Sequence, residues 1–127
     1  MQLEPFIRVD DVSFSATQED VLRLRGTPAL VCRNGIGLNE LDYGDVIYRF
    51  QDCGRLEEIT QQAPVLQFGN VSVPFGVLAS FVRTSDPALF ERAGMLVSPR
   101  FGLAFDPGER CWVTALAAHC LDEWRAL

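Results

Sequence analysis

The sequence predicts an α+β fold: one domain in which two tandem helix-plus-β-hairpin repeats form an antiparallel sheet with helices on one face. Three observations predict it, namely an internal repeat, one amphipathic helix in each half, and a strand hairpin after each helix. The 127 residues suit a single domain, and no polar linker divides them. We therefore expect repeats at about 6–63 and 64–114 and a C-terminal helix at 115–127.

The repeat consists of identical residues placed 59 positions apart. The pairs that share this spacing are Val12/Val71, Ser13/Ser72, Pro28/Pro87, Ala29/Ala88, Leu30/Leu89, Arg33/Arg92 and Gly35/Gly94. A duplicated unit of this size predicts a folded platform whose halves present a joint surface. It predicts no particular reaction.

The first half is expected to begin with two short extended segments, at 6–9 and 12–14. Ser15 and Gln18 have the spacing of a capping box, in which each residue's side chain binds the other's backbone N–H. This signature predicts a helix over 17–25.

A hairpin is the clearest strand signal in the first half. Residues 45–51 alternate between two sets of side chains, which is typical of a strand with one buried face. A turn at 52–55 leads into a second strand at 56–60, and a shorter strand at 29–32 precedes the pair. The residues expected to be buried on the first strand are Val46, Tyr48 and Phe50.

The second half repeats this order of elements. Extended segments at 65–68 and 71–73 precede an apolar helix over 74–83, which we expect to be buried more deeply than its counterpart. Residues 88–93 are expected to form a short helical turn. The second hairpin is expected from strands at 101–105 and 110–114.

The charge of the chain limits its function. All 11 basic residues are arginine, against 17 Asp and Glu, so the formal net charge is −6. The absence of lysine excludes Schiff-base and P-loop lysine chemistry. An acidic chain is a poor match for nucleic acid and a good match for a basic protein.

No apolar run approaches the roughly 18 residues that span a bilayer, and no secretory signal is recognised at residues 1–8. We therefore expect a cytoplasmic protein with no membrane partner.

The metal-ligating residue types are sparse. Cys32, Cys53, Cys111 and Cys120 lack the C-x-x-C spacing of zinc sites. We expect free, mostly buried thiols in a reducing compartment, with a disulfide as the alternative. The single histidine, His119, is expected on the solvated face of the C-terminal helix. No cofactor or metal is expected.

The segments Glu19 to Pro28 and Tyr43 to Ile59 carry the order helix, Gly-x-Pro, strand and hairpin. This order resembles the small repeat of the beta-lactamase inhibitor protein family and of the SmpA/OmlA outer-membrane lipoproteins. The resemblance covers the first half better than the second. It implies a non-enzymatic protein that presents a sheet surface to another protein. The chain lacks the signal peptide, lipidation cysteine and paired structural cysteines of those families, so a soluble relative would look like a cytoplasmic immunity protein.

Acidic and aromatic residues concentrate between positions 40 and 58. The candidate binding residues are Glu40, Asp42, Tyr43, Asp45, Asp52, Glu57 and Glu58. Carboxylates would attract a basic partner, and buried aromatic rings would prolong the complex. Tyr43 is interpreted either as an exposed contact residue or as a packed turn residue. Glu57 and Glu58 would point to opposite faces of a strand, so we expect a solvated sheet edge rather than a catalytic pair.

These features favour a non-enzymatic protein-binding module. The most concrete hypothesis is a bacterial immunity or inhibitor protein that neutralises a basic toxin or effector by occlusion. The alternative is a small-molecule-binding or thiol-dependent metabolic protein that uses a helix–sheet cavity, with Cys32 or Cys53 as the reactive thiol. A structural subunit that docks through the helix at 74–83 is a third hypothesis. Trp112 and Trp124 are expected to be core or helix-packing residues rather than recognition anchors.

Overall fold

The computed structural model describes residues 1–127 and confirms the α+β class. The large sheet consists of β4 (Leu30–Arg33), β5 (Asn39–Asp42), β6 (Val46–Phe50), β7 (Leu56–Gln62), β10 (Phe90–Arg92), β11 (Met95–Ser98), β12 (Leu103–Phe105) and β13 (Trp112–Leu116). The small sheets consist of β1 (Leu3–Glu4), β2 (Arg8–Val9) and β3 (Val12–Ser13), and of β8 (Val65–Phe68) and β9 (Val71–Pro74). The helices are α1 (Gln18–Arg25), α2 (Phe75–Ser85) and α3 (Cys120–Arg125).

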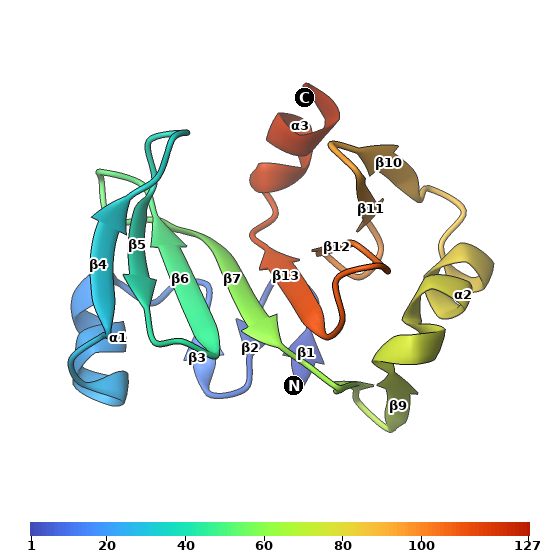
Figure 1. Cartoon of the computed structure of the whole chain (residues 1–127), viewed down its shortest axis with the longest axis horizontal. Coiled ribbons are helices and arrows are strands. Elements are labelled where there is room, and N and C mark those ends of the chain that lie inside the picture. The colour runs from blue at the N-terminus through green and yellow to red at the C-terminus, as the bar shows by residue number, and fades with distance from the viewer.

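The large sheet is antiparallel throughout, with the order β10-β11-β12-β13-β7-β6-β5-β4. Its two four-stranded halves meet where β7 pairs with β13, and Figure 1 shows the halves on either side of this pair. An antiparallel sheet is as predicted, but it is not the only sheet, because β1 to β3 and β8 with β9 form two small sheets of their own. None of the three helices is both long enough and apolar enough to cross a membrane.

The first hairpin follows the alternation of its sequence. Strands β6 and β7 pair as predicted, and Val46, Tyr48 and Phe50 are all buried. Strands β5 and β11 were not predicted. The helical turn expected at 88–93 is wrong, because β10 and β11 form a hairpin there. Both residues of its two-residue loop, Ala93 and Gly94, have positive φ, as a type I′ turn requires.

The helices begin and end differently from the prediction. Thr17, and not Ser15, caps α1: its hydroxyl accepts from the Asp20 backbone N–H, and the Asp20 carboxylate accepts from the Thr17 N–H. Helix α2 begins after Pro74 and is apolar, as expected. The C-terminal helix is much shorter than 115–127, because β13 extends through Leu116 and α3 begins only at Cys120.

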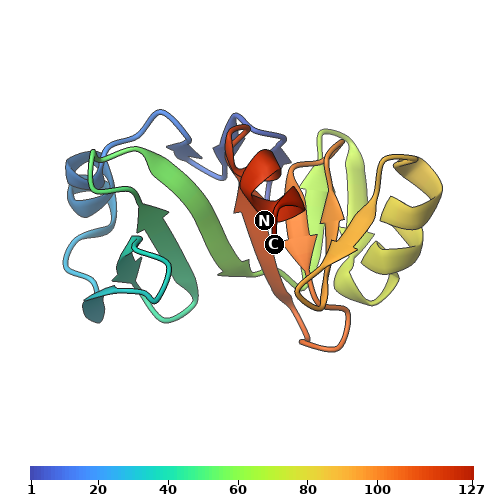
Figure 2. The same ribbon diagram turned by 90° about the horizontal axis from the view of Figure 1, so that it is seen from above.

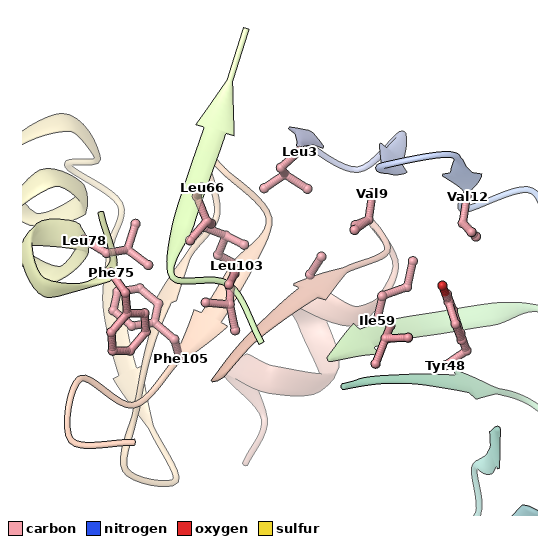
Figure 3. Close-up of a cluster of buried hydrophobic side chains, with 14 of the residues drawn as sticks. Leu3, Val9, Val12, Tyr48, Ile59, Leu66, Phe75, Leu78, Leu103 and Phe105 are labelled. Atoms are coloured by element: carbon pink, nitrogen blue, oxygen red, sulfur yellow. The ribbon is translucent and has the colours of Figure 1, made fainter. Parts of the chain in front are cut away.

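The main core lies on one face of the large sheet. Figure 3 shows Leu3, Val9 and Val12 projecting from the three-stranded sheet toward Tyr48 and Ile59 of the large sheet. Helices α1 and α2 pack against the same core through their buried residues, which are Val21 of α1 and Phe75, Leu78 and Val82 of α2. Figure 2 shows these two helices at opposite ends of the molecule, with α3 nearer its middle.

Helix α3 packs on the other face, so the prediction of helices on one face is wrong. On β11, Leu96 belongs to the main core, whereas its neighbour Val97 belongs to a second cluster that also holds Cys120 of α3. Adjacent strand residues point to opposite faces. The second cluster therefore lies opposite the main core. Its other buried members are Ala104, Leu116 and Ala117.

Candidate functional site

The face of the sheet opposite the main core carries a groove of about 650 Å³. Residues of β5, β6, β7 and β13 form its floor, and α3, Met95 of β11 and two loops form its walls. The loop residues come from the β4–β5 and β12–β13 connections. The groove therefore joins segments from both halves of the chain. Its charged residues are Glu40, Arg49, Glu58, Asp106, Glu109 and Glu123.

A polar network crosses the floor of the groove. Arg49 lies between Glu40 and Glu58, with Nε 2.7 Å from a Glu40 oxygen and Nη1 3.5 Å from a Glu58 oxygen. The same Nη1 donates to the Thr60 hydroxyl at 2.5 Å, and the Thr60 and Thr114 hydroxyls lie 2.9 Å apart. The network thus continues across the pairing of β7 with β13. No buried side-chain nitrogen or oxygen in the protein lacks a hydrogen-bond partner.

The two floor carboxylates are shifted in opposite directions. Burial alone would raise the pKa of Glu40, but hydrogen bonding to Arg49, the Arg49 charge and the Asn34 amide together lower it. Burial raises the pKa of Glu58, and Arg49 and Trp124 only partly oppose that shift. The ionised form is therefore favoured at Glu40 and disfavoured at Glu58, although both carboxylates face Arg49.

Two tryptophans, the only ones in the chain, line the groove. Trp112 comes from β13 and Trp124 from α3, and both are half-buried. Trp124 packs against the second cluster, as expected of a helix-packing residue, whereas Trp112 is not a member of either core cluster. With five carboxylates and one guanidinium around them, they give the groove an acidic rim and aromatic surfaces. This combination suits a cationic ligand, since indole faces attract positive groups.

The predicted binding residues do not form one surface. Glu40 and Glu58 lie in the groove. Asp52 lies outside it, is exposed, and pairs with Arg33 while accepting a hydrogen bond from the Asn39 amide at 3.0 Å. Asp52 therefore closes the hairpin turns of the first half.

The remaining turn residues belong to another part of the surface. The Tyr43 hydroxyl donates to the Gly26 carbonyl at 2.9 Å, and its ring packs edge-on against Tyr48 with centroids 5.9 Å apart. Tyr43 is thus a packed turn residue, the second of its two interpretations. Tyr43 and Asp45 line a separate depression, and the Asp42 carboxylate accepts from a backbone N–H of the β5–β6 turn.

Glu57 departs from the expected strand geometry because β7 contains a bulge. Arg49 lies opposite Glu58, but Phe50 lies opposite Leu56, which leaves Glu57 as the extra residue. Strand β7 is also central in the sheet and not at its edge. The prediction of a solvated edge for Glu57 and Glu58 is therefore wrong.

The bulge buries Glu57 against the start of α3. Its side chain is 1% exposed, with one carboxylate oxygen 2.5 Å from His119 Nε2 and the other 2.6 Å from Cys120 Sγ. The backbone N–H of Ala117 donates to the Glu57 carbonyl at 2.9 Å. His119 is therefore not the solvated residue that was expected. Among the Cys, His, Asp and Glu residues, Glu57, His119 and Cys120 form the cluster with metal-ligand spacing.

The four cysteines are free, but only Cys120 is fully buried. Burial, followed by the Glu57 carboxylate, raises the pKa of the Cys120 thiol. Desolvation, followed by Glu40, raises the pKa of Cys32. Both shifts oppose formation of a reactive thiolate. Cys53 is exposed and Cys111 half-buried, so the expectation of mostly buried thiols is wrong.

Comparison of the chain with protein-family models, with curated proteins and with solved structures finds no match. The resemblance to the small repeat of beta-lactamase inhibitor protein therefore stays a hypothesis.

Proposed function

We propose that this protein is a non-enzymatic binding protein whose groove receives a basic segment of a partner protein. The observation that carries the proposal is the make-up of the groove, with five carboxylates and one guanidinium beside two half-buried tryptophans. The carboxylates would attract and orient a cationic segment, and the indoles would supply contact area once it is seated. Glu109 and Glu123 are exposed, so they are available for encounter.

In its most concrete form, the proposal is a cytoplasmic bacterial immunity or inhibitor protein that acts by occlusion. A toxin or effector would lose access to its own target while its basic segment lies in the groove. Such a protein needs no catalytic residue and no cofactor. The formal net charge of −6 would further raise the association rate with a basic partner.

The thiol-dependent alternative has less support. The pKa values of Cys32 and Cys120 are both raised, whereas a nucleophilic thiol needs a lowered pKa. Small-molecule binding is favoured by one observation, because a volume of about 650 Å³ lies within the range of ligand pockets. An uncharged small ligand would bind equally well after the charge of the groove rim is reversed, whereas a basic segment would not.

We also propose that the two halves arose by duplication. In each half, a helix is followed by a four-stranded meander, β4 to β7 after α1 and β10 to β13 after α2. The positions that are identical at a spacing of 59 support the same origin. On this view the pairing of β7 with β13 joins the two units into one binding surface.

The test is a titration with an arginine-rich peptide, followed by the fluorescence anisotropy of a label on the peptide. The groove variant is Glu109→Lys/Glu123→Lys, and its matched control is Glu19→Lys/Glu91→Lys, which changes the charge equally at exposed sites outside the groove. We expect the groove variant to weaken binding about tenfold and the control variant to weaken it less, although both change the net charge equally. Added salt should weaken binding to the wild type, because it screens the charges of the groove. Equal affinities of the two variants, or no binding at low salt, would contradict the proposal.

A further inference from the structure

We propose that Glu57, His119 and Cys120 form a binding site for a zinc ion. Their ligand atoms lie within 4.8 Å of one another. Together they offer one carboxylate oxygen, one imidazole nitrogen and one sulfur. Zinc accepts this mixture of donors, whereas magnesium and calcium prefer oxygen ligands alone. The site is independent of the proposed groove function.

The backbone places the three ligands from two rigid elements. His119 and Cys120 stand at the first turn of α3, and Glu57 is the bulged residue of β7. The connection between the elements is held by the hydrogen bond from the Ala117 N–H to the Glu57 carbonyl. Bulges recur where a strand has to aim a side chain at a functional site.

The three side chains already meet at one point, but their contacts are shorter than those around a bound ion. Glu57 lies 2.5 Å from His119 Nε2 and 2.6 Å from Cys120 Sγ. Tetrahedral zinc at its usual bond lengths separates its ligand atoms by about 3.3–3.7 Å. The ligands therefore have to move apart by about 1 Å. Rotation of His119, whose side chain is 27% exposed, widens its own contact with Glu57 and opens a path for the ion, and a turn of the Glu57 carboxylate has to widen the contact with Cys120.

Charge balance favours an ion at this position. Glu57 is 1% exposed and Cys120 is fully buried. A carboxylate, a thiolate, a neutral imidazole and Zn²⁺ together carry no net charge, so the loaded site is compatible with burial. Binding forms a sulfur–zinc bond and releases the Cys120 thiol proton to solvent. Three protein ligands leave a fourth position for water, on the side where His119 is accessible.

The test is a titration of the reduced, full-length chain with Co²⁺, a spectroscopic probe, followed by competition with Zn²⁺. We expect one equivalent of Co²⁺, with visible bands of a tetrahedral site and a thiolate-to-cobalt charge-transfer band, both abolished by Zn²⁺. Cys120→Ser should remove the charge-transfer band, and the matched control Cys53→Ser should keep it. His119→Gln should weaken Zn²⁺ binding about tenfold or more.

Because Cys120 is buried, its variant requires circular dichroism as a check on folding. His119→Gln changes a partly exposed side chain, so it tests the site even if Cys120→Ser does not fold. Absence of the charge-transfer band from the wild-type chain would overturn the proposal. So would a band that persists in Cys120→Ser, or an unchanged Zn²⁺ affinity in His119→Gln. The peptide titration, repeated with a chelator present, keeps the groove proposal separate from this result.

Discussion

The two faces of the eight-stranded sheet are built from alternate residues of the same strands and have opposite characters. On β6, Tyr48 and Phe50 are at most 2% exposed and belong to the main core. Between them, Arg49 points into the groove and pairs with carboxylates. A single strand thus contributes to stability through one face and to a candidate binding surface through the other. Changes on the groove face are expected to alter binding and to destabilise the fold less than truncations on the core face.

The faces also differ in how they are covered. The three-stranded sheet, α1, α2 and the β8–β9 hairpin all contribute residues to the main core. On the groove face α3 is the only helix, and it packs over the cluster that holds Val97, Ala104 and Leu116. The residues of β5, β6 and β7 on this face remain lined up along the groove. Helix α3 follows the second half only. The groove face of β5, β6 and β7 in the first half is therefore not covered by a helix.

The largest expected effect comes from truncating the core face. Ile59→Ala should lower the free energy of unfolding by about 2–5 kcal/mol, because Ile59 is fully buried and its loss leaves a cavity. Its neighbour Thr60 points to the groove, and Thr60→Ala should lower it by about 1 kcal/mol through lost hydrogen bonds. Urea denaturation of both variants measures the comparison. Similar losses of unfolding free energy for the two variants would contradict the view that the core face supplies most of the stability.

The next effect concerns the arginine of the groove floor. Arg49→Gln should lower the free energy of unfolding by about 1–3 kcal/mol. The side chains of Glu40 and Glu58 are only 16% and 13% exposed, and they would lose their charge partner. The matched control is Arg33→Gln, whose pair with Asp52 is exposed and should contribute less than about 1 kcal/mol. Denaturant midpoints of the two variants give the answer. A larger loss of unfolding free energy in Arg33→Gln than in Arg49→Gln would contradict the view that the floor network is shielded from solvent.

A smaller effect should separate the two floor carboxylates by pH. The folded pKa of Glu40 is lowered, so its ionisation stabilises the fold above pH 4.5 and the benefit is lost as pH falls through the folded pKa. The folded pKa of Glu58 is raised, so stability is gained as pH falls through that value. At pH 7, Glu40→Gln should destabilise the protein by about 1 kcal/mol, whereas Glu58→Gln should be neutral or stabilising.

Both differences should vanish at acidic pH, where the wild-type carboxyls are protonated too. Thermal unfolding of the two variants and the wild type between pH 3 and pH 7 provides the measurement. Opposite trends with pH are the required result. If both variants lose stability equally at pH 7, the two carboxylates are equivalent and the assignment of their environments is incorrect.

Local sequence patterns predicted the parts of the fold that depend on local physics. Alternation along residues 45–51 identified β6, because one of its faces is buried. The bulge at Glu57 could not be predicted, since it depends on the pairing of β7 with β6 and on the contact with α3. The Ala93–Gly94 loop could have been recognised, because a glycine at a two-residue turn between short strands is a known hairpin signal.

The groove could be predicted only in part. Glu40 and Glu58 were identified from the concentration of acidic residues in the first half. Trp112 and Trp124 were assigned to the core or to helix packing, because large aromatic side chains usually have that role. They reach the groove only through the pairing of β7 with β13 and the turn into α3, which are contacts between distant parts of the chain. Such contacts leave no periodic signal in the sequence.

The most direct test asks whether a basic ligand covers the groove. The protein has two tryptophans, and both line it, so acrylamide quenching of the intrinsic fluorescence reports the accessibility of this face alone. We expect the arginine-rich peptide to lower the quenching constant in the wild type and to need a higher concentration in Glu109→Lys/Glu123→Lys. A peptide that binds tightly while both indoles stay as accessible as before would contradict the account.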